Sequence, residues 1–340
     1  MTARADRQGV EIPDRVLLPT LAAALAAAAV VSLCLGSAPM AAADVLAALV
    51  GGGGEVERII VLELRLPRVV LGILLGAALG FAGAALQGLL RNPLADPGVI
   101  GVTAAAGFGA VLAIGFGLAA MSVLMVPLAA IAGATIATVL LFSVAARNDS
   151  LLVLILTGIG ISSLATALTS LAFNLAPDPI TLRDMILWLL GSLENRTTTD
   201  LFVAAPFVVA GWAAMAGIGR GLDALSLGEE TTRSLGIDVA GLRWRVVLGV
   251  SASVGAMVAV CGAVGFVGLV VPHMVRPFVG YRPGRVLTAS ALGGAILITL
   301  ADLVTRIPTG GERLQLGVVT ALIGAPVFIW IVQRSWMTSR

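Results

Sequence analysis

Apolar residues in this chain occur in long runs that are separated by short clusters of charged residues, proline and glycine. A helix needs about 20 apolar residues to cross a bilayer, and the runs predict ten spans. They lie near residues 16–35, 66–90, 99–118, 121–146, 151–173, 201–220, 244–262, 269–279, 286–306 and 316–334. The pattern therefore predicts an all-α fold, in which residues 1–340 form a single, polytopic, ten-helix membrane domain.

The composition supports a membrane protein rather than a soluble one. The 340 residues are 59% hydrophobic and 12% charged, with a mean hydropathy of +1.04. About a quarter of the residues in a typical soluble domain are charged. One globular core cannot bury so much apolar surface, and the short loops leave no room for a separate soluble domain. The lipid bilayer is therefore the first predicted partner.

The distribution of arginine predicts the orientation in the inner membrane. All 21 basic residues are arginine; seven fall on one side of the ten spans, and the other fourteen fall on the side that holds both termini. Loops rich in positive charge face the cytoplasm, so both termini are predicted to be cytoplasmic. The first run exceeds the apolar core of a signal peptide, about 7–15 residues, and is predicted to be an uncleaved span. Arg65, Arg68 and Arg306 lie at predicted outer helix ends, against the trend.

The residue types that the chain lacks exclude several kinds of chemistry. A P-loop needs lysine, and the chain has none, so it cannot hydrolyse ATP at a Walker site. His273 is the single histidine, and Cys34 and Cys261 lie in apolar runs without metal-ligand spacing. We therefore expect no catalytic residue, no metal site and no cofactor. The net charge of +2 is too small to indicate a nucleic-acid partner.

Small residues recur every four positions in the second run. They are Gly72, Gly76, Gly80, Ala84 and Gly88. Such a stripe lets another helix backbone approach closely, so this span is predicted to be buried among other helices.

Two loops are predicted to form short helices. On the outer side, Thr181 and Asp184 have spacing similar to a capping box, and Gly191 follows, which predicts a helix over 182–190. On the inner side, the loop at 220–245 has Ser226 and Glu229 at the same spacing. It predicts a capped helix that ends at Gly236. The leucines of this loop indicate a surface for a partner, or packing against the inner rim of the bundle.

Glycine and proline interrupt the apolar segment at 262–276. Gly262, Gly265, Gly268 and Pro272 break what would otherwise be one helix. Broken helices at membrane depth are tolerated where protein or a water-filled cavity covers the freed backbone groups, and they are typical of transport pathways. His273 follows this break, and a lone histidine there is more often a packed or interfacial residue than a ligand.

Several motifs along nearly the whole chain resemble the FecCD permease family. They are Arg65-Leu66-Pro67-Arg68, Gly83-Ala84-Ala85-Leu86-Gln87, Arg91-Asn92-Pro93-Leu94-Ala95-Asp96-Pro97, Trp188-Leu189-Leu190-Gly191-Ser192-Leu193, Leu227-Gly228-Glu229, Leu235-Gly236, Gly265-Phe266-Val267-Gly268-Leu269-Val270-Val271-Pro272-His273, Ala301-Asp302, Gly317-Val318-Val319-Thr320 and Gly324-Ala325-Pro326. These permeases are the membrane subunits of type II ABC importers for iron-siderophores, haem and cobalamin. The resemblance implies a ten-helix fold, a second permease subunit, identical or homologous, two cytoplasmic ATPase subunits and an extracytoplasmic binding protein.

The resemblance also implies roles for particular residues. Arg65, Arg68 and Arg306 match outward-facing arginines that receive carboxylates of the binding protein, although Arg306 has the spacing to pair with Asp302 instead. The inner loop matches the segment that contacts the ATPase. Its candidate residues are Leu227, Gly228, Glu229, Glu230, Arg233, Leu235 and Gly236. The inner gate falls near Asp149, Ser150 and Leu151, and the broken helix comprises Gly265, Gly268, Pro272 and His273.

These observations predict a permease that carries an iron chelate. A ferric siderophore is the first choice, and haem and cobalamin are the alternatives. An ion-coupled secondary transporter is the competing class, but it would be expected to carry intramembrane carboxylates, and Asp302 beside Arg306 is the one convincing candidate. Paired carboxylates or a His/Ser/Asp group at membrane depth would indicate an enzyme. The sequence shows neither in its predicted spans.

Overall fold

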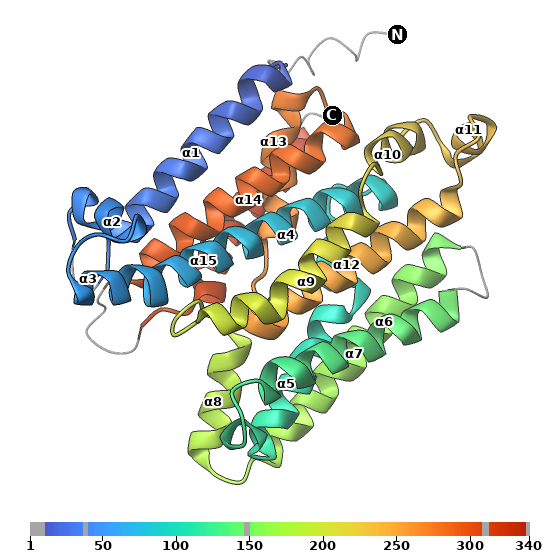
Figure 1. Cartoon of the computed structure of the whole chain (residues 1–340). Coiled ribbons are helices and arrows are strands. Elements are labelled where there is room, and N and C mark those ends of the chain that lie inside the picture. The colour runs from blue at the N-terminus through green and yellow to red at the C-terminus, as the bar shows by residue number, and fades with distance from the viewer. Residues whose placement is uncertain (1–10, 37–39, 146–149, 308–312, 338–340) are drawn as a thin grey trace.

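Figure 1 shows the computed structural model of the chain, which describes residues 11–36, 40–145, 150–307 and 313–337. Within these ranges the fold is all-α, as predicted, and contains no β-strand. The longer helices are α1 (Asp14–Cys34), α4 (Leu66–Leu90), α5 (Val102–Gly115), α6 (Met125–Ala145), α7 (Leu151–Asn174), α9 (Thr198–Ala214), α12 (Val239–Cys261), α14 (Pro283–Thr305) and α15 (Leu316–Met337). The shorter ones are α2 (Ala42–Leu49), α3 (Glu55–Ile59), α8 (Pro179–Leu189), α10 (Gly219–Leu225), α11 (Glu229–Ser234) and α13 (Val267–Val275).

The described helices match the ten predicted spans. Six are long and apolar enough to cross a membrane: Asp14–Cys34, Glu55–Leu90, Met125–Val144, Leu151–Asn174, Val239–Cys261 and Pro283–Thr305. The helices α9 and α10, bent by 52° to each other, are long and apolar enough for a seventh when they are taken together. Three shorter apolar helices supply the rest: Val102–Gly115, Val267–Val279 and Leu316–Trp330.

The centre of the bundle is α4, because its small-residue stripe admits other backbones. A β-carbon on Gly76 would overlap the carbonyl oxygen of Gly294 in α14, and one on Gly80 would overlap that of Ser290. In the apolar stretch of this helix, 72% of the residues are buried. In the corresponding stretch of α7, only 17% are buried. The predicted burial of this span is therefore confirmed.

The bundle has two ends, which lie on opposite sides in Figure 1. One carries α2 and α3 together with the C-terminal ends of α1 and α14, and we refer to it as the α2 end. The other carries α10 and α11 with the first turns of α1 and α14, and we refer to it as the α11 end. The loop between the first two spans holds α2, which was not predicted from the sequence.

Two predicted helix starts are wrong. The short helix expected at 182–190 begins at Pro179, because Asp178 caps it by accepting from the backbone N–H groups of Ile180 and Thr181. The Thr181 hydroxyl also donates to Asp178 at 2.6 Å, and this bond is the largest cause that lowers the pKa of that carboxyl. The span expected from residue 66 continues a helix that starts at Glu55, since the charged residues there end the apolar run without breaking a helix.

Candidate functional site

A buried carboxylate at the α2 end, that of Asp302, holds two arginines. Nε of Arg68 lies 3.0 Å from both carboxylate oxygens of Asp302, and its Nη2 lies 2.8 Å from Oδ1. Arg306 donates to Oδ2 of the same residue through Nε at 3.1 Å and Nη2 at 2.6 Å. Asp302 is 3% exposed. One carboxylate therefore pairs with two guanidinium groups, and the three side chains keep a net charge of +1.

The same end fixes the last turn of α1 through arginine side chains. Arg306 donates through Nη1 to the carbonyl of Ser32 at 2.7 Å, and Arg65 donates to those of Leu33 at 2.6 Å and Cys34 at 3.0 Å. The final carbonyl groups of a helix lack partners within it and carry partial negative charge. These arginines therefore join α1, α4 and α14 into one unit.

A π-helical turn brings Arg65 into this unit. The helix that starts at Glu55 passes through a π-turn at Ile60–Arg65 before α4 begins. Such turns insert an extra residue into the helical repeat and are frequent at functional sites. Here the turn directs Arg65 inward to α1, where it is 7% exposed. The resemblance singled out Arg65, but no sequence signal predicted the π-turn.

The three predicted docking arginines thus lie together, but their guanidinium groups face inward. The side chains of Arg68 and Arg306 are 15% and 11% exposed. The i,i+4 pair of Arg306 with Asp302, which the sequence spacing offered as the alternative, is present. Docking of a binding protein on these residues stays a prediction.

The predicted break between the seventh and eighth spans is a short loop between α12 and α13. The helix α12 ends at Cys261, and Gly262 and Phe266 both have left-handed backbones, at φ +75° and +69°. Pro272 lies inside α13, the short helix that follows, and His273 lies partly buried in its last turn. Phe266, the residue just before α13, has a left-handed backbone conformation, which is usually adopted by glycine.

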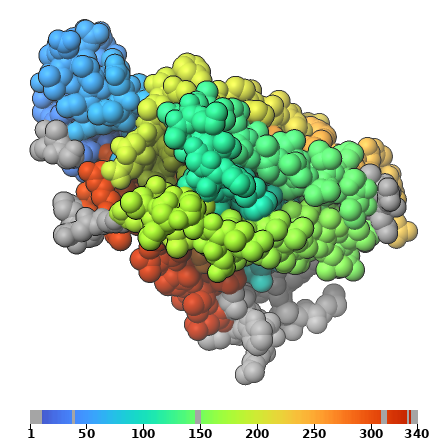
Figure 2. All heavy atoms as spheres, turned by 90° about the horizontal axis from the view of Figure 1, so that it is seen from below, coloured from blue at the N-terminus to red at the C-terminus, as the bar shows by residue number. Residues whose placement is uncertain are grey.

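Neighbouring backbone segments satisfy the polar groups near the break. The N–H of Ser192 donates to the carbonyl of Cys261 at 2.8 Å, and the first turn of α15 pairs with the end of α8 through Gly317 N–H and Leu190 O at 2.9 Å. Protein therefore covers the freed groups, as such a break requires. An apolar hollow of about 410 Å³ opens here between α8, the break and α15. Figure 2 shows α7 and α8 in light green on this side, with α15 in red beside them.

Gly265, one of the residues predicted to interrupt the helix, has open space around it. A β-carbon there would meet nothing within 4 Å, and its φ is not in the left-handed region. The crowded positions are Gly262, where a β-carbon would overlap the carbonyl of Trp188, and Gly268, where it would lie 3.0 Å from the carbonyl oxygen of Leu79. The tight reversal is therefore set by Gly262, and Gly265 only borders the hollow.

The predicted coupling segment forms a short helix, although its cap differs from the prediction. The helix α11 begins at Glu229 after Gly228, and Ser226 donates instead to the carbonyl of Asp223 in α10 at 2.6 Å. The expected capping box is wrong because α10 extends to Leu225 and uses this hydroxyl at its own end.

The rest of the segment carries paired charges on α11 and exposed leucines on either side of it. Glu229 and Glu230 lie in the first turn, and Arg233 donates to Glu229 at 2.8 Å. Leu227 and Leu235 are 67% and 60% exposed, so packing against the inner rim does not account for them. Gly236 ends the segment at φ +79°.

The predicted gate lies partly outside the described residues. Asp149 is not among them, while Ser150 precedes α7 and Leu151 is its first residue. Much of α7 is exposed on its apolar side, including Leu156, Ile159 and Leu164. This helix therefore has an apolar face that the described part of the chain does not cover.

Comparison with known proteins identifies the family. The model of the FecCD transport family matches residues 24–334. The chain belongs to this family. It is a multi-pass permease subunit of an ABC importer, and ATP hydrolysis is carried out by a separate subunit. The family membership decides against the ion-coupled secondary transporter.

Named relatives and a solved structure support the assignment across most of the chain. The vitamin B12 import system permease protein BtuC of Vibrio cholerae is 41% identical over 286 residues, 83% of this chain and 85% of that protein. The Fe(3+) dicitrate transport system permease protein FecD of Escherichia coli is 37% identical over 281 residues, which cover 83% of this chain and 87% of that protein. A solved metal-chelate type ABC transporter in an inward-facing conformation aligns with a TM-score of 0.83 at 33% identity, covering 95% of this permease and all of that chain.

One polar contact inside the bundle was not predicted from the sequence. Gln87 of α4 is 2% exposed, and its amide nitrogen lies 3.2–3.3 Å from the carbonyl oxygens of Ala95, Gly268 and Leu269. Its own oxygen accepts from Arg276 at 2.6 Å. A glutamine in an apolar run was the available signal, since a buried amide needs partners for all its polar atoms.

Proposed function

We propose that this permease forms the membrane pathway for a bulky metal chelate. The observation that carries the proposal is the apolar hollow beside the broken helix, lined by Leu189, Leu190, Ala263, Gly265, Gly317, Val318, Ala321 and Leu322. None of these side chains is charged, which suits a large ligand of low net charge that is released rather than held.

Two kinds of chelate are candidates for the substrate. A ferric siderophore is the first expectation from the family, and the relative named for ferric dicitrate supports it. A corrinoid is the second candidate, favoured by relatives in Vibrio cholerae and Halobacterium salinarum that are named for vitamin B12 or cobalamin import.

Uptake by the assembled importer tests both candidates. The permease would be reconstituted with its ATPase and binding protein in vesicles, and accumulation of ⁵⁷Co-cyanocobalamin and of ⁵⁵Fe-siderophore would be measured with and without ATP. ATP-dependent uptake of one of them identifies the substrate. Accumulation driven by an ion gradient without the ATPase would contradict the proposal.

The proposed assembly contains two permeases, two cytoplasmic ATPase subunits and one extracytoplasmic binding protein. The exposed apolar faces of α7 and α15, which include Leu156, Ile159 and Leu322, support a second permease subunit, identical or homologous, beside this one. Exposed leucines on either side of α11 support contact with the ATPase. Mass measurement of the complex in detergent would show two permease chains, and a single chain would contradict the pairing.

The proposed orientation places the α11 end and both termini in the cytoplasm. The segment around Ser150 and Leu151 then forms part of the inner gate, and Arg65, Arg68 and Arg306 lie at the end that the binding protein approaches. Ser234 in α11 is exposed, and the Ser234→Cys variant should react there with a membrane-impermeant maleimide only after the cells are opened. Labelling of this position in intact spheroplasts would contradict the orientation.

A further inference from the structure

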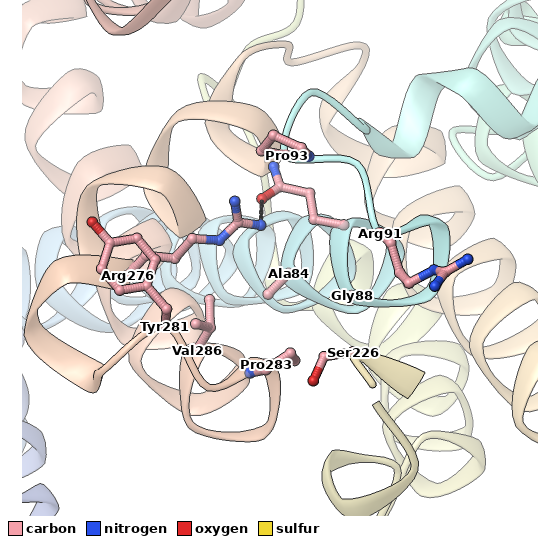
Figure 3. A pocket seen from close by; sticks show the side chains of 10 residues that line it. Ala84, Gly88, Arg91, Pro93, Ser226, Arg276, Tyr281, Pro283 and Val286 are labelled. Atoms are coloured by element: carbon pink, nitrogen blue, oxygen red, sulfur yellow. Dashed lines mark hydrogen bonds between the residues drawn. The ribbon is translucent and has the colours of Figure 1, made fainter. Parts of the chain in front are cut away.

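A cavity of about 230 Å³ opens at the α11 end of the bundle (Figure 3). Its floor is α4, with Ala84, Gln87 and Gly88, and its walls are the turn before α14 and the residue that precedes the coupling segment, Ser226. The remaining lining residues are Arg91, Pro93, Arg276, Tyr281, Pro283 and Val286. The lining thus includes two arginines, two hydroxyl groups and no carboxylate.

The position of Arg276 is fixed by a buried neutral partner. It donates through Nη2 to Gln87 at 2.6 Å, and the amide nitrogen of Gln87 is directed to carbonyl groups at the start of α13. The glutamine oxygen therefore faces the arginine. In Figure 3, Arg276 extends over Ala84, and Arg91 points away from it. Arg276 is thus the cation within the cavity, and Arg91 adds positive charge at its rim.

Arg276 has no counter-charge among the described residues. It is partly buried, and no Asp or Glu of the described ranges forms an ion pair with it. A guanidinium offers five N–H donors in a fixed fork that matches a carboxylate. A cation that has lost part of its hydration and has only an amide partner is favourably placed to bind an anion.

We propose that this cavity accepts a carboxylate side chain of the ATPase subunit, as a second contact beside α11. Two observations favour this occupant: the lining is positively charged, and Ser226 directly precedes the exposed Leu227 of the coupling segment. The inference rests on the proposed function of that segment. Because Gln87 joins Arg276 to the first turn of α13, the carboxylate would connect the ATPase to the broken helix.

Association of the ATPase with permease variants tests the proposal. In nanodiscs of phosphatidylcholine, Arg276→Gln should weaken ATPase binding about tenfold, as expected for loss of one charge-assisted pair. Arg282→Gln, an exposed arginine six residues away in the same region, is the control and should bind normally. Some Asp→Arg or Glu→Arg change on the ATPase surface should restore binding to Arg276→Glu.

A second variant separates the site from effects on folding. Ser226 is exposed, and Ser226→Asp would place a competing carboxylate at the rim without removing any arginine. It should weaken ATPase binding several-fold, whereas Ser226→Asn should not. Normal binding by both Arg276→Gln and Ser226→Asp would overturn the proposal.

Two comparisons distinguish a carboxylate of the ATPase from a lipid phosphate in the cavity, and from ATPase contact through α11 alone. If Arg276→Gln acts only when phosphatidylglycerol is added to the nanodiscs, a lipid phosphate fills the cavity and the proposal is wrong. If Glu229→Ala with Arg233→Ala weakens ATPase binding while the cavity variants do not, the coupling role of α11 stands and the second contact is rejected. If neither the cavity variants nor the α11 variants change ATPase binding, the cavity contact and the coupling role of α11 are both rejected.

Discussion

Arginine side chains at the two ends of the bundle have different kinds of partner. At the α2 end, Arg68 and Arg306 share the buried carboxylate of Asp302, and Arg306 also binds carbonyl groups of α1. At the α11 end, Arg276 is held by the neutral amide of Gln87. The arginines of the α2 end thus pair with a carboxylate of the same chain. Arg276, by contrast, is a cation that faces a cavity. Family resemblance drew attention to the arginines of the α2 end, but the arginine that faces a cavity with no carboxylate partner among the described residues, Arg276, lies at the α11 end.

The largest expected effect concerns Asp302 and its two arginines. Asp302→Ala leaves two poorly exposed guanidinium groups without their carboxylate, and breaking a buried pair in this way costs about 3 kcal/mol. Thermal unfolding in detergent should show a clearly lowered midpoint. Asp44→Ala, an exposed carboxylate on α2 at the same end, should have little effect. Equal midpoints for the two variants would mean that Asp302 does not hold this end together.

The second prediction concerns the contact between α4 and the broken helix. A β-carbon on Gly83 would overlap the carbonyl oxygen of Gly268, so Gly83→Ala must separate α4 from α13 and pull Gln87 from its carbonyl partners. Overpacking of this kind costs about 2 kcal/mol, and ATP-dependent uptake should fall with the stability. Gly265→Ala, which has open space around it, is the control for thermal stability. If both variants lost the same amount of stability, the assignment of the tight contact to Gly83 would be contradicted.

The third prediction tests whether the arginines of the α2 end also receive a partner. Arg306→Ala is the cleanest single change, because Asp302 keeps its bidentate bond to Arg68. Loss of one partly desolvated pair should weaken association of the binding protein about tenfold, and high salt should reduce the difference. Arg313→Ala, with a half-exposed side chain paired to Glu194, is the control. Unchanged association would mean that the arginines only fix α1, α4 and α14.

The smallest effect on stability is expected at the coupling helix. The side chains of Glu229 and Arg233 are 41% and 59% exposed, and an exposed i,i+4 pair contributes only about 0.3–0.5 kcal/mol. Arg233→Ala removes this pair and leaves Glu229 beside the buried Arg243, so it should leave the unfolding midpoint nearly unchanged while ATP-dependent uptake falls. Full uptake with an intact complex would contradict the coupling role of α11.

The sequence predicted the location of most structural elements better than their ends. Apolar runs placed all ten spans, because a chain in a bilayer must present about 20 apolar residues for each crossing. The helix starts at Pro179 and Glu55 were missed, and so was α2. Charged residues end an apolar run without ending a helix, and Asp178 competes with Thr181 as a cap in a way that only the folded loop reveals.

The sequence by itself determined that this chain is an all-helical membrane permease, because hydropathy and ordered motifs depend on local residues alone. The tertiary structure decided which charges meet. Asp302 and Arg68 are 234 positions apart, and Arg276 and Gln87 are 189 apart. No local pattern encodes such pairs, since they depend on how α4, α13 and α14 pack. That packing places Asp302 between two arginines at one end of the bundle and leaves a positively charged cavity at the other.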